Sequence, residues 1–292
     1  MTEILPHFIG IGAPRCGTRW LSQCLSEHPE VGIPEEEVYF FSTRRLVHSF
    51  WSRGLSWYSS VLNSGIGPQT KVWGEITPFY LYDEDSASLI QQTVPNVKLI
   101  CCLRDQSERA YSWYTLFLRY NPDLVYTRFS FQQFLTYCGD VYGREGFYLE
   151  HIERYLKLFP RESILFLVYD DLETNSLSYI QRAFNFLGVD ESFVPPSAVK
   201  RINRMNSMDM PKSLVWAKVT RKLARHGLAR LARLIRNANI VSMQRNELPD
   251  RHRMSAEMRE RMYSMFATHN EQLGEFLGRD LSHWNTGATR RV

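Results

Sequence analysis

Short apolar runs alternate along this chain with longer stretches in which apolar residues recur at helical spacing. The run VKLICCL at 97–103 is almost continuously apolar, which is typical of a strand buried on both faces of a parallel sheet. The alternation predicts an α/β fold with a central parallel sheet of about four or five strands flanked by helices. The expected strands are 8–11, 71–75, 97–103 and 164–168, and the expected helices are 18–28, 83–93, 129–137, 147–159, 176–187 and 255–277.

Chain length and net charge limit the number of domains and the kinds of partner. The chain has 292 residues and a formal net charge of +4. Such a length suits one large α/β domain or two small ones, and we expect a single domain over residues 1–292 with an irregular basic segment at about 199–250. The mildly basic balance is compatible with an anionic cofactor or substrate and does not require nucleic acid as a partner.

Cysteine usage and the N-terminal residues predict a compartment. The five cysteines lack the pattern of a disulfide scaffold, and Cys101 and Cys102 are adjacent within an apolar run. Buried thiols in a reducing cytosol are therefore expected, which favours a cytoplasmic location. The N-terminus has no basic region followed by a long apolar one, so we expect no signal peptide. No run reaches the roughly 20 apolar residues of a transmembrane span.

The first stretch with chemical character is a glycine-bounded loop between an expected strand and helix. It runs from Gly12 to Gly17, and Thr18 opens an amphipathic stretch that Pro29 ends. A helix N-terminus offers N–H groups and a positive dipole end, so this loop is suited to bind an anion. Arg15 adds a positively charged side chain to the loop. The spacing G-x-x-x-x-G resembles a P-loop, but Thr18 occupies the position of the Walker lysine, which argues against an ordinary ATPase or kinase.

The segment PRCGTRWL, residues 14–21, resembles the phosphosulfate loop of sulfotransferases that use 3′-phosphoadenosine 5′-phosphosulfate (PAPS), which reads roughly P-K/R-x-G-T-T/S-x-L. The resemblance implies a P-loop-like three-layer fold, PAPS as sulfuryl donor and 3′-phosphoadenosine 5′-phosphate (PAP) as product. It implies that Arg15 is catalytic and also binds the cofactor. The other cofactor-binding residues implied by this loop are Cys16, Gly17, Thr18, Arg19 and Trp20.

Three acidic residues, 35–37, stand directly before the apolar and aromatic residues 38–41. The segment could be a solvated acidic turn beside core aromatics. Alternatively, one carboxylate is desolvated against an apolar wall, which would raise its pKa towards that of a general base. The pattern resembles the E-x-x-F-F segment that supplies the catalytic glutamate of glycosaminoglycan N- and O-sulfotransferases. This resemblance implies Glu37 as the base, with Glu36 and Glu75 as the nearest rivals.

A second chemical motif follows the strand expected at 97–103. The segment LRDQSERAYSWY, residues 103–114, resembles the 3′-phosphate segment of the same family, with Gln106 in place of the usual proline. Arg104 at the strand end and Ser112 about two helical turns later can both reach one phosphate. Arg109 is expected to be structural. Strand-end placement suits ligand binding in an open α/β sheet.

The stretch GEITPFY at 74–80 is similar to the family's G-E-K-S/T-P-x-Y segment, which borders the acceptor. Ile76 replaces the lysine of that pattern, so the resemblance implies no acceptor-binding lysine here. The acceptor is expected to be a carbohydrate or another hydroxylated metabolite, with a hydroxyl or an amine as the attacking group.

The basic segment after Val199 matches no family motif. Relatives often close a basic flap over PAPS from this region, and we include Arg201 among the expected cofactor-binding residues. Residues 212–236 carry eight Lys and Arg and no acid, with an apolar stripe between them. Such a basic amphipathic helix can be a solvated face, the rim of an anionic substrate site or a peripheral membrane contact.

The segments at 147–189 and 278–284 are similar to scaffold regions of the family, and Asp170 and Asp171 are expected to orient loops. The histidines and cysteines show no spacing of metal ligands, no nucleophile elbow is present, and no nucleic-acid motif appears. We therefore expect a metal-independent sulfotransferase. The alternatives are a P-loop nucleotide kinase and a non-catalytic module of the same fold that binds PAP or glycans.

Overall fold

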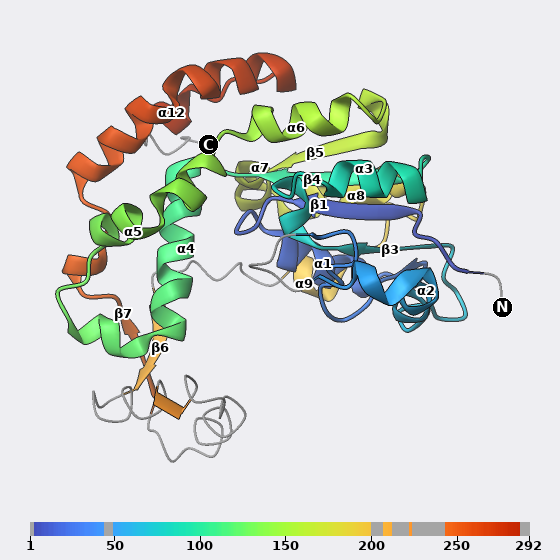
Figure 1. The fold of residues 1–292 in the computed structure, drawn as a ribbon, viewed down its shortest axis with the longest axis horizontal. Coiled ribbons are helices and arrows are strands. Elements are labelled where there is room, and N and C mark those ends of the chain that lie inside the picture. Colours follow the sequence, from blue (N-terminus) through green and yellow to red (C-terminus); the bar gives the residue numbers. More distant parts are fainter. Residues whose placement is uncertain (1–2, 44–48, 200–206, 212–221, 224–242, 287–292) are drawn as a thin grey trace.

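A parallel sheet forms the centre of the computed structural model, which describes residues 3–43, 49–199, 207–211, 222–223 and 243–286. The sheet has five strands in the order β2-β3-β1-β4-β5, and every neighbouring pair is parallel (Figure 1). The predicted α/β fold with a parallel sheet of four or five strands is confirmed. The strands are β1 (Phe8–Gly12), β2 (Val31–Gly32), β3 (Val72–Ile76), β4 (Lys98–Leu103) and β5 (Ile164–Val168).

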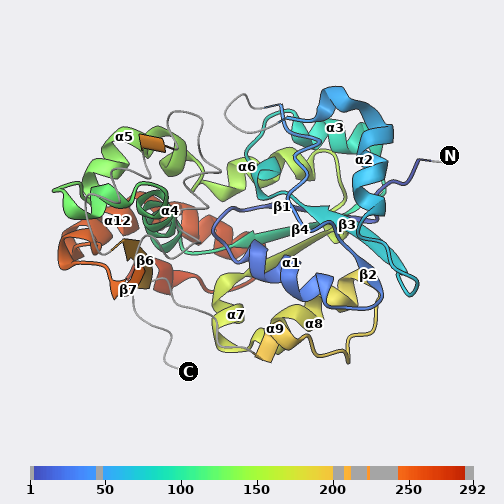
Figure 2. The same cartoon turned by 90° about the horizontal axis from the view of Figure 1, so that it is seen from below.

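Helices cover both faces of this sheet, as expected when strands are joined by right-handed crossovers. Figure 2 shows helices on both sides of the sheet, so the molecule has three layers here. The helices of one side are α1 (Thr18–Ser26), α8 (Ser176–Leu187) and α9 (Pro196–Val199). Those of the other side are α2 (Gly54–Asn63), α3 (Ser86–Thr93) and α6 (Tyr148–Leu156). The short helix α7 (Tyr169–Thr174) directly follows β5.

A second group of helices extends from one end of the sheet, on the left in Figure 1. It consists of α4 (Gln106–Tyr120), α5 (Phe131–Arg144) and α12 (Ala256–Leu277), and we call it the helical lobe. Asp105 begins α4 by accepting hydrogen bonds from the N–H groups of Ser107 and Glu108. The lobe has its own apolar cluster, formed by Ala110, Tyr114, Leu118, Val125, Phe131, Phe134, Leu248, Met262 and Phe266.

The remaining elements are short. Two strands, β6 (Ser207–Pro211) and β7 (Met243–Glu247), pair with each other in antiparallel fashion. The 3₁₀ turns are Trp51–Arg53, Pro78–Leu81, Pro122–Tyr126, Arg161–Ser163, Asp250–His252 and Ser282–Asn285.

Most expected elements lie where periodicity placed them. The helix predicted at 176–187 has those bounds and ends at Gly188, whose φ of 79° suits a glycine C-cap. The helix predicted at 129–137 instead begins at Phe131 and continues to Arg144, through Gly139. A single glycine costs a helix only about 1 kcal/mol, and the packing of Phe131 and Phe134 on Tyr114 anchors the first half of α5.

Two sequence predictions fall largely outside this structure. Arg201 lies outside the described residues, as does the basic segment 212–236 apart from residues 222–223. Among the helices that the structure does describe, none combines the length and the apolar character that a membrane crossing requires.

Candidate functional site

Four parallel strands bring the candidate residues to one edge of the sheet. Because β1, β3, β4 and β5 run in the same direction, their carboxyl ends lie together. The loop 12–17 follows β1, Thr77 follows β3, Arg104 follows β4 and Tyr169 follows β5. The site is therefore assembled from segments that are far apart in the sequence.

The loop between β1 and α1 has the backbone of an anion-binding turn. Arg15 and Gly17 have positive φ angles of 70° and 88°, and such backbone forms concavities lined by N–H groups. A Cβ at Gly17 would lie 3.1 Å from side-chain atoms of Leu172 and Tyr169, so both conformation and space favour glycine. No side chain caps α1 and its first turn holds no acid, which leaves its positive end suited to an anion.

Arg15 connects this loop to α4. Its Nε donates to Ser112 Oγ over 2.9 Å, and its carbonyl oxygen accepts from Arg104 Nη1 over 3.4 Å. Three predicted anion-binding residues therefore lie together. Desolvation lowers the pKa of Arg15 to about 10, and the positive charges of Arg104 and Arg119 act in the same direction. A partly buried group of like charges favours a ligand that carries negative charge.

The surroundings of Arg104 fix its position at the end of β4. Its guanidinium carbon lies 4.3 Å from the ring centroid of Tyr169, a cation–π contact, and its carbonyl oxygen accepts from the Tyr148 hydroxyl over 2.8 Å. The same hydroxyl lies 3.7 Å from Cys16 Sγ. Burial raises the pKa of the Cys16 thiol, which is fully buried. The side chain of Cys16 thus packs under the loop, and only its backbone is left to serve a ligand.

The structural role predicted for Arg109 agrees with its surroundings. The side chain is fully buried, and its Nη1 lies 3.1 Å from Glu145 Oε2. The guanidinium also lies over the rings of Tyr82 and Tyr148, at 5.6 and 5.9 Å from their centroids. Tyr148, which packs against Arg109, contacts both Cys16 and the backbone of Arg104. The buried ion pair therefore helps to hold Tyr148 in place behind the candidate site.

Glu37 lies in the irregular segment after β2, at the rim of the site. Its side chain is exposed, and the Tyr39 hydroxyl donates a hydrogen bond to its carboxylate. Nearby protein atoms desolvate the carboxyl and raise its pKa, while the Tyr39 hydrogen bond and the positive charge of Arg19 oppose this rise. The direction matches that expected of a general base. Arg19 lies in the first turn of α1, directly after the anion-binding loop, and its positive charge acts on the Glu37 carboxylate.

Glu75, one of the two rivals of Glu37, has a different environment. It is 1% exposed and accepts hydrogen bonds from the hydroxyls of Tyr58, Thr77 and Tyr80. Burial raises its pKa to about 7. An acceptor cannot reach a carboxylate enclosed in this way without displacing its partners. The other rival, Glu36, is exposed.

Aromatic side chains border the Glu37 segment. The ring centroid of Phe79 lies 6.1 Å from that of Tyr39 and 6.0 Å from that of Trp113, which directly follows Ser112. The three rings form a chain of two ring contacts from the Glu37 segment to α4, and we call this set the aromatic wall. No single sequence motif contains all three residues, because they come from three separate segments.

The remaining predicted residues are dispersed around the first turn of α1. Arg19 is exposed, and Thr18 is buried in the first turn. Trp20 is half-buried and packs edge-on against Tyr179 of α8, with ring centroids 5.8 Å apart. Its buried Nε1 has no hydrogen-bond partner among the described residues.

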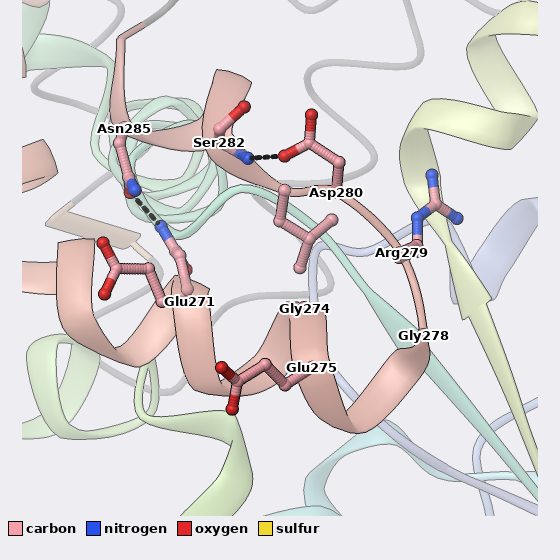
Figure 3. Close-up of a pocket in the computed structure, with 10 residues that line it drawn as sticks. Glu271, Gly274, Glu275, Gly278, Arg279, Asp280, Ser282 and Asn285 are labelled. Atoms are coloured by element: carbon pink, nitrogen blue, oxygen red, sulfur yellow. Dashed lines mark hydrogen bonds between the residues drawn. The ribbon is translucent and has the colours of Figure 1, made fainter.

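A surface hollow of about 540 Å³ lies at the C-terminal end of α12 (Figure 3). Glu271, Glu275 and Asp280 give it acidic groups, and Asp280 accepts a hydrogen bond from the Ser282 N–H. None of the predicted site residues lines this hollow, and its acidic character disfavours an anionic ligand. Within the described part of the chain, no group of three or more His, Cys, Asp or Glu side chains is placed to hold a metal ion.

Comparison with known proteins agrees with this geometry. Residues 5–276 match the family model described as the sulfotransferase domain. The chain belongs to the sulfotransferase family. This confirms the family resemblance that the two motifs indicated.

Two curated relatives show which kinds of sulfotransferase the chain resembles. The chain is 30% identical over 206 residues to the bifunctional heparan sulfate N-deacetylase/N-sulfotransferase 3 of Mus musculus, a match that covers 65% of this chain and 23% of the relative. It is 31% identical over 194 residues to the Mus musculus heparan sulfate glucosamine 3-O-sulfotransferase 3B1, covering 63% of this chain and 46% of the relative. The matches thus span less than half of each of these curated relatives.

A solved structure supports the fold. The sulfotransferase from Alicyclobacillus acidocaldarius superimposes with a TM-score of 0.67 at 22% identity, covering 96% of this chain and 99% of the other. This likeness confirms the predicted P-loop-like sulfotransferase fold over nearly the whole chain.

Proposed function

We propose that this sulfotransferase transfers the sulfuryl group of PAPS to a hydroxyl of a carbohydrate acceptor, with Glu37 as general base. The observation that carries the proposal is the joining of Arg15, Ser112 and Arg104 at the uncapped N-terminus of α1, with Glu37 at the rim of the same region. The family assignment supports sulfuryl transfer over the nucleotide kinase alternative.

The described residues fit a donor that carries two separate phosphates. The uncapped first turn of α1 and the lowered pKa of Arg15 both favour bound negative charge. The backbone of Gly17, Thr18 and Arg19 would hold the 5′-phosphate, whose developing charge Arg15 would neutralise. Arg104 and Ser112 would hold the 3′-phosphate. PAPS would supply an activated sulfuryl group, so the protein has to contribute positioning and charge neutralisation.

Glu37 would take the proton of the acceptor hydroxyl. A hydroxyl attacks poorly while it keeps its proton, and a carboxylate within hydrogen-bond reach removes it as the new bond forms. Desolvation raises the pKa of Glu37, which strengthens it as a base, and the Tyr39 hydroxyl keeps its carboxylate oriented. Because its side chain is exposed, an acceptor can approach it from solvent.

Two observations support an uncharged or weakly charged carbohydrate as the acceptor. The aromatic wall of Tyr39, Phe79 and Trp113 borders the Glu37 segment, and aromatic rings pack well on the apolar faces of sugar rings. Ile76, in the position of the family's lysine, is 6% exposed and packs against Gly10 of β1. An anionic group of the acceptor therefore finds no cation at this position.

The direct test is a transfer screen with ³⁵S-labelled PAPS against glycans, lipids and phenols. Transfer to a glycan hydroxyl that Glu37→Gln abolishes would support the whole proposal. Labelling confined to lipids or phenols would overturn the acceptor class. PAP binding without transfer to any acceptor would indicate a non-catalytic module, and Mg-dependent ATP turnover would indicate a kinase.

A further inference from the structure

A buried hydrogen-bond network lies behind the Glu37 segment. Thr77, directly after β3, is held to the sheet by its N–H, which donates to the Gly10 carbonyl over 2.9 Å. Its Oγ1 accepts from the backbone N–H groups of Val38 and Tyr39 over 3.1 and 3.2 Å. The Tyr80 hydroxyl accepts from the Phe41 N–H over 3.2 Å. Two side chains that follow β3, those of Thr77 and Tyr80, therefore hold three backbone groups of the segment that follows Glu37.

The carboxylate of Glu75 sets the direction of these hydrogen bonds. The Thr77 hydroxyl donates to Glu75 Oε2 over 2.6 Å, and the Tyr80 hydroxyl donates to Oε1 over 2.9 Å. An ionised carboxylate only accepts, so both hydroxyl protons must point towards Glu75. The hydroxyl oxygens are then left to accept from Val38, Tyr39 and Phe41. If the side chain at position 75 donated a hydrogen bond instead, the proton of the Thr77 or Tyr80 hydroxyl would have to turn away from it. That proton would then point towards a backbone N–H group, and the hydrogen bond from this N–H would be lost.

The backbone at Tyr39 shows why such an anchor is needed. Its φ is 53°, in the left-handed region that a bulky aromatic residue rarely adopts. Residues held in such conformations persist where the surrounding structure over-determines them, and they gather at functional sites. Here the Tyr39 N–H is held by Thr77, while its hydroxyl donates to Glu37. Tyr39 therefore links the network to Glu37, because its N–H is bound to Thr77 and its hydroxyl is bound to the Glu37 carboxylate.

We infer that Glu75 and Thr77 are positioning residues, which act through Tyr39 to hold Glu37 in place for proton abstraction. This inference rests on the proposed function of Glu37 as the base. Burial raises the pKa of Glu75 to about 7, so its ionised, accepting form predominates in mildly alkaline solution. Tyr58, the third donor, stacks on Phe40 and completes the enclosure of Glu75.

The test compares conservative variants at pH 8, where the ionised form of Glu75 predominates. Thr77→Val removes the hydroxyl and keeps the shape, Thr77→Ser keeps the hydroxyl, and Glu75→Gln introduces a donor. Tyr155→Phe is the matched control, because it removes a buried hydroxyl that donates to the Tyr80 carbonyl and has no hydrogen bond to residues 37–41. We expect Thr77→Val and Glu75→Gln to lower kcat by roughly tenfold to a hundredfold, typical of a misplaced catalytic group, with PAP affinity unchanged.

Thr77→Ser should restore most of the kcat lost in Thr77→Val. The acid limb of the kcat/KM profile should also move to higher pH in Thr77→Val, because the Tyr39 hydrogen bond that lowers the pKa of Glu37 is weakened. Tyr155→Phe should leave this limb in place. The inference is overturned if Thr77→Val matches Tyr155→Phe in kcat and pH profile, or if Thr77→Ser is as impaired as Thr77→Val.

Amide hydrogen exchange separates this inference from the proposed function. Exchange at Val38, Tyr39 and Phe41 should be faster in Thr77→Val and Glu75→Gln than in the wild type, and unchanged in Tyr155→Phe. If the wild-type protein transfers no sulfuryl group, the proposed function fails, and unchanged exchange at these residues would show that the anchor itself is wrong.

Discussion

Arg15 Nε donates a hydrogen bond to Ser112 Oγ over 2.9 Å, although 97 positions separate the two residues. This contact joins the loop after β1 to the second turn of α4, and Arg104 bonds to the carbonyl of the same arginine. The two chemical motifs of the chain therefore form one cationic region. A substitution in either motif should therefore alter the affinity for a ligand group bound by the other motif.

The first prediction concerns recognition of the 3′-phosphate. PAP should raise Tm far more than AMP does, because stabilisation by a ligand follows its occupancy of the folded state. Arg104→Ala should remove most of this difference, since the charged partner of the phosphate is lost. Lys71→Ala, a loss of the same charge at the opposite end of β3, serves as the control. Equal thermal shifts from PAP and AMP with the wild-type protein would contradict the assignment.

The second prediction concerns Arg15. Arg15→Ala should lower the transfer rate on the order of a hundredfold or more, the usual effect of removing one preorganised charge stabiliser. Arg15→Lys keeps the charge but loses the Nε donor to Ser112, so it should retain part of the activity. Single-turnover rates with saturating PAPS measure both effects. Near-normal turnover in the alanine variant would refute the role.

The third prediction concerns Glu37. Glu37→Gln keeps the shape and removes the base, so the rate should fall by roughly 10²–10⁴-fold while PAP affinity is nearly unchanged. Glu36→Gln, one position away and also exposed, is the matched control and should remain active. Because desolvation raises the pKa of Glu37, the acid limb of kcat/KM should lie above the model-peptide value of about 4.3. Normal turnover in Glu37→Gln would exclude this residue as the base.

The fourth prediction concerns the buried Arg109–Glu145 ion pair. Glu145→Ala leaves the fully buried Arg109 without this carboxylate and should lower the free energy of unfolding by about 3–5 kcal/mol. A double variant, Arg109→Met with Glu145→Leu, replaces the pair by apolar packing and should recover most of that loss. Urea unfolding of the three proteins measures both effects. A single variant no less stable than the double variant would contradict the expected cost of the unpaired charge.

The fifth prediction is a pH dependence of stability at Asp171. Desolvation alone would raise the pKa of Asp171, but its hydrogen bonds and charge interactions with Arg279 and Arg182 hold the pKa below 3.8. A carboxyl with a lowered folded-state pKa stabilises the protein above the unfolded-state pKa, and this contribution is lost as the pH falls.

The difference in Tm between wild type and Asp171→Asn should therefore be large at pH 6 and should shrink below about pH 4. Asp250→Asn, at a side chain that is 92% exposed, is the control and should show little difference at either pH. A Tm difference for Asp171→Asn that stays constant from pH 6 to pH 3 would show that the lowered pKa does not stabilise the fold.

Local patterns in the sequence predicted four of the five strands of the central sheet, six of the helices and the loop that begins the site. Whether a residue belongs to a strand or a helix depends on side-chain spacing within about ten positions, which the sequence displays directly. The same holds for the Gly12–Gly17 loop and for the placement of Arg104 and Ser112 two helical turns apart. These features needed no knowledge of which segments meet in space.

Only the tertiary structure decided what Glu75 does. In the sequence it is one glutamate at the end of a strand and a rival of Glu37 for the role of base. Its hydroxyl partners come from α2 and from the residues that follow β3. Two of these hydroxyls, those of Thr77 and Tyr80, in turn accept hydrogen bonds from backbone N–H groups between residues 38 and 41. Hydrogen bonds between distant segments depend on strand order and register, which are properties of the whole sheet. The periodicity of a single segment therefore cannot reveal them.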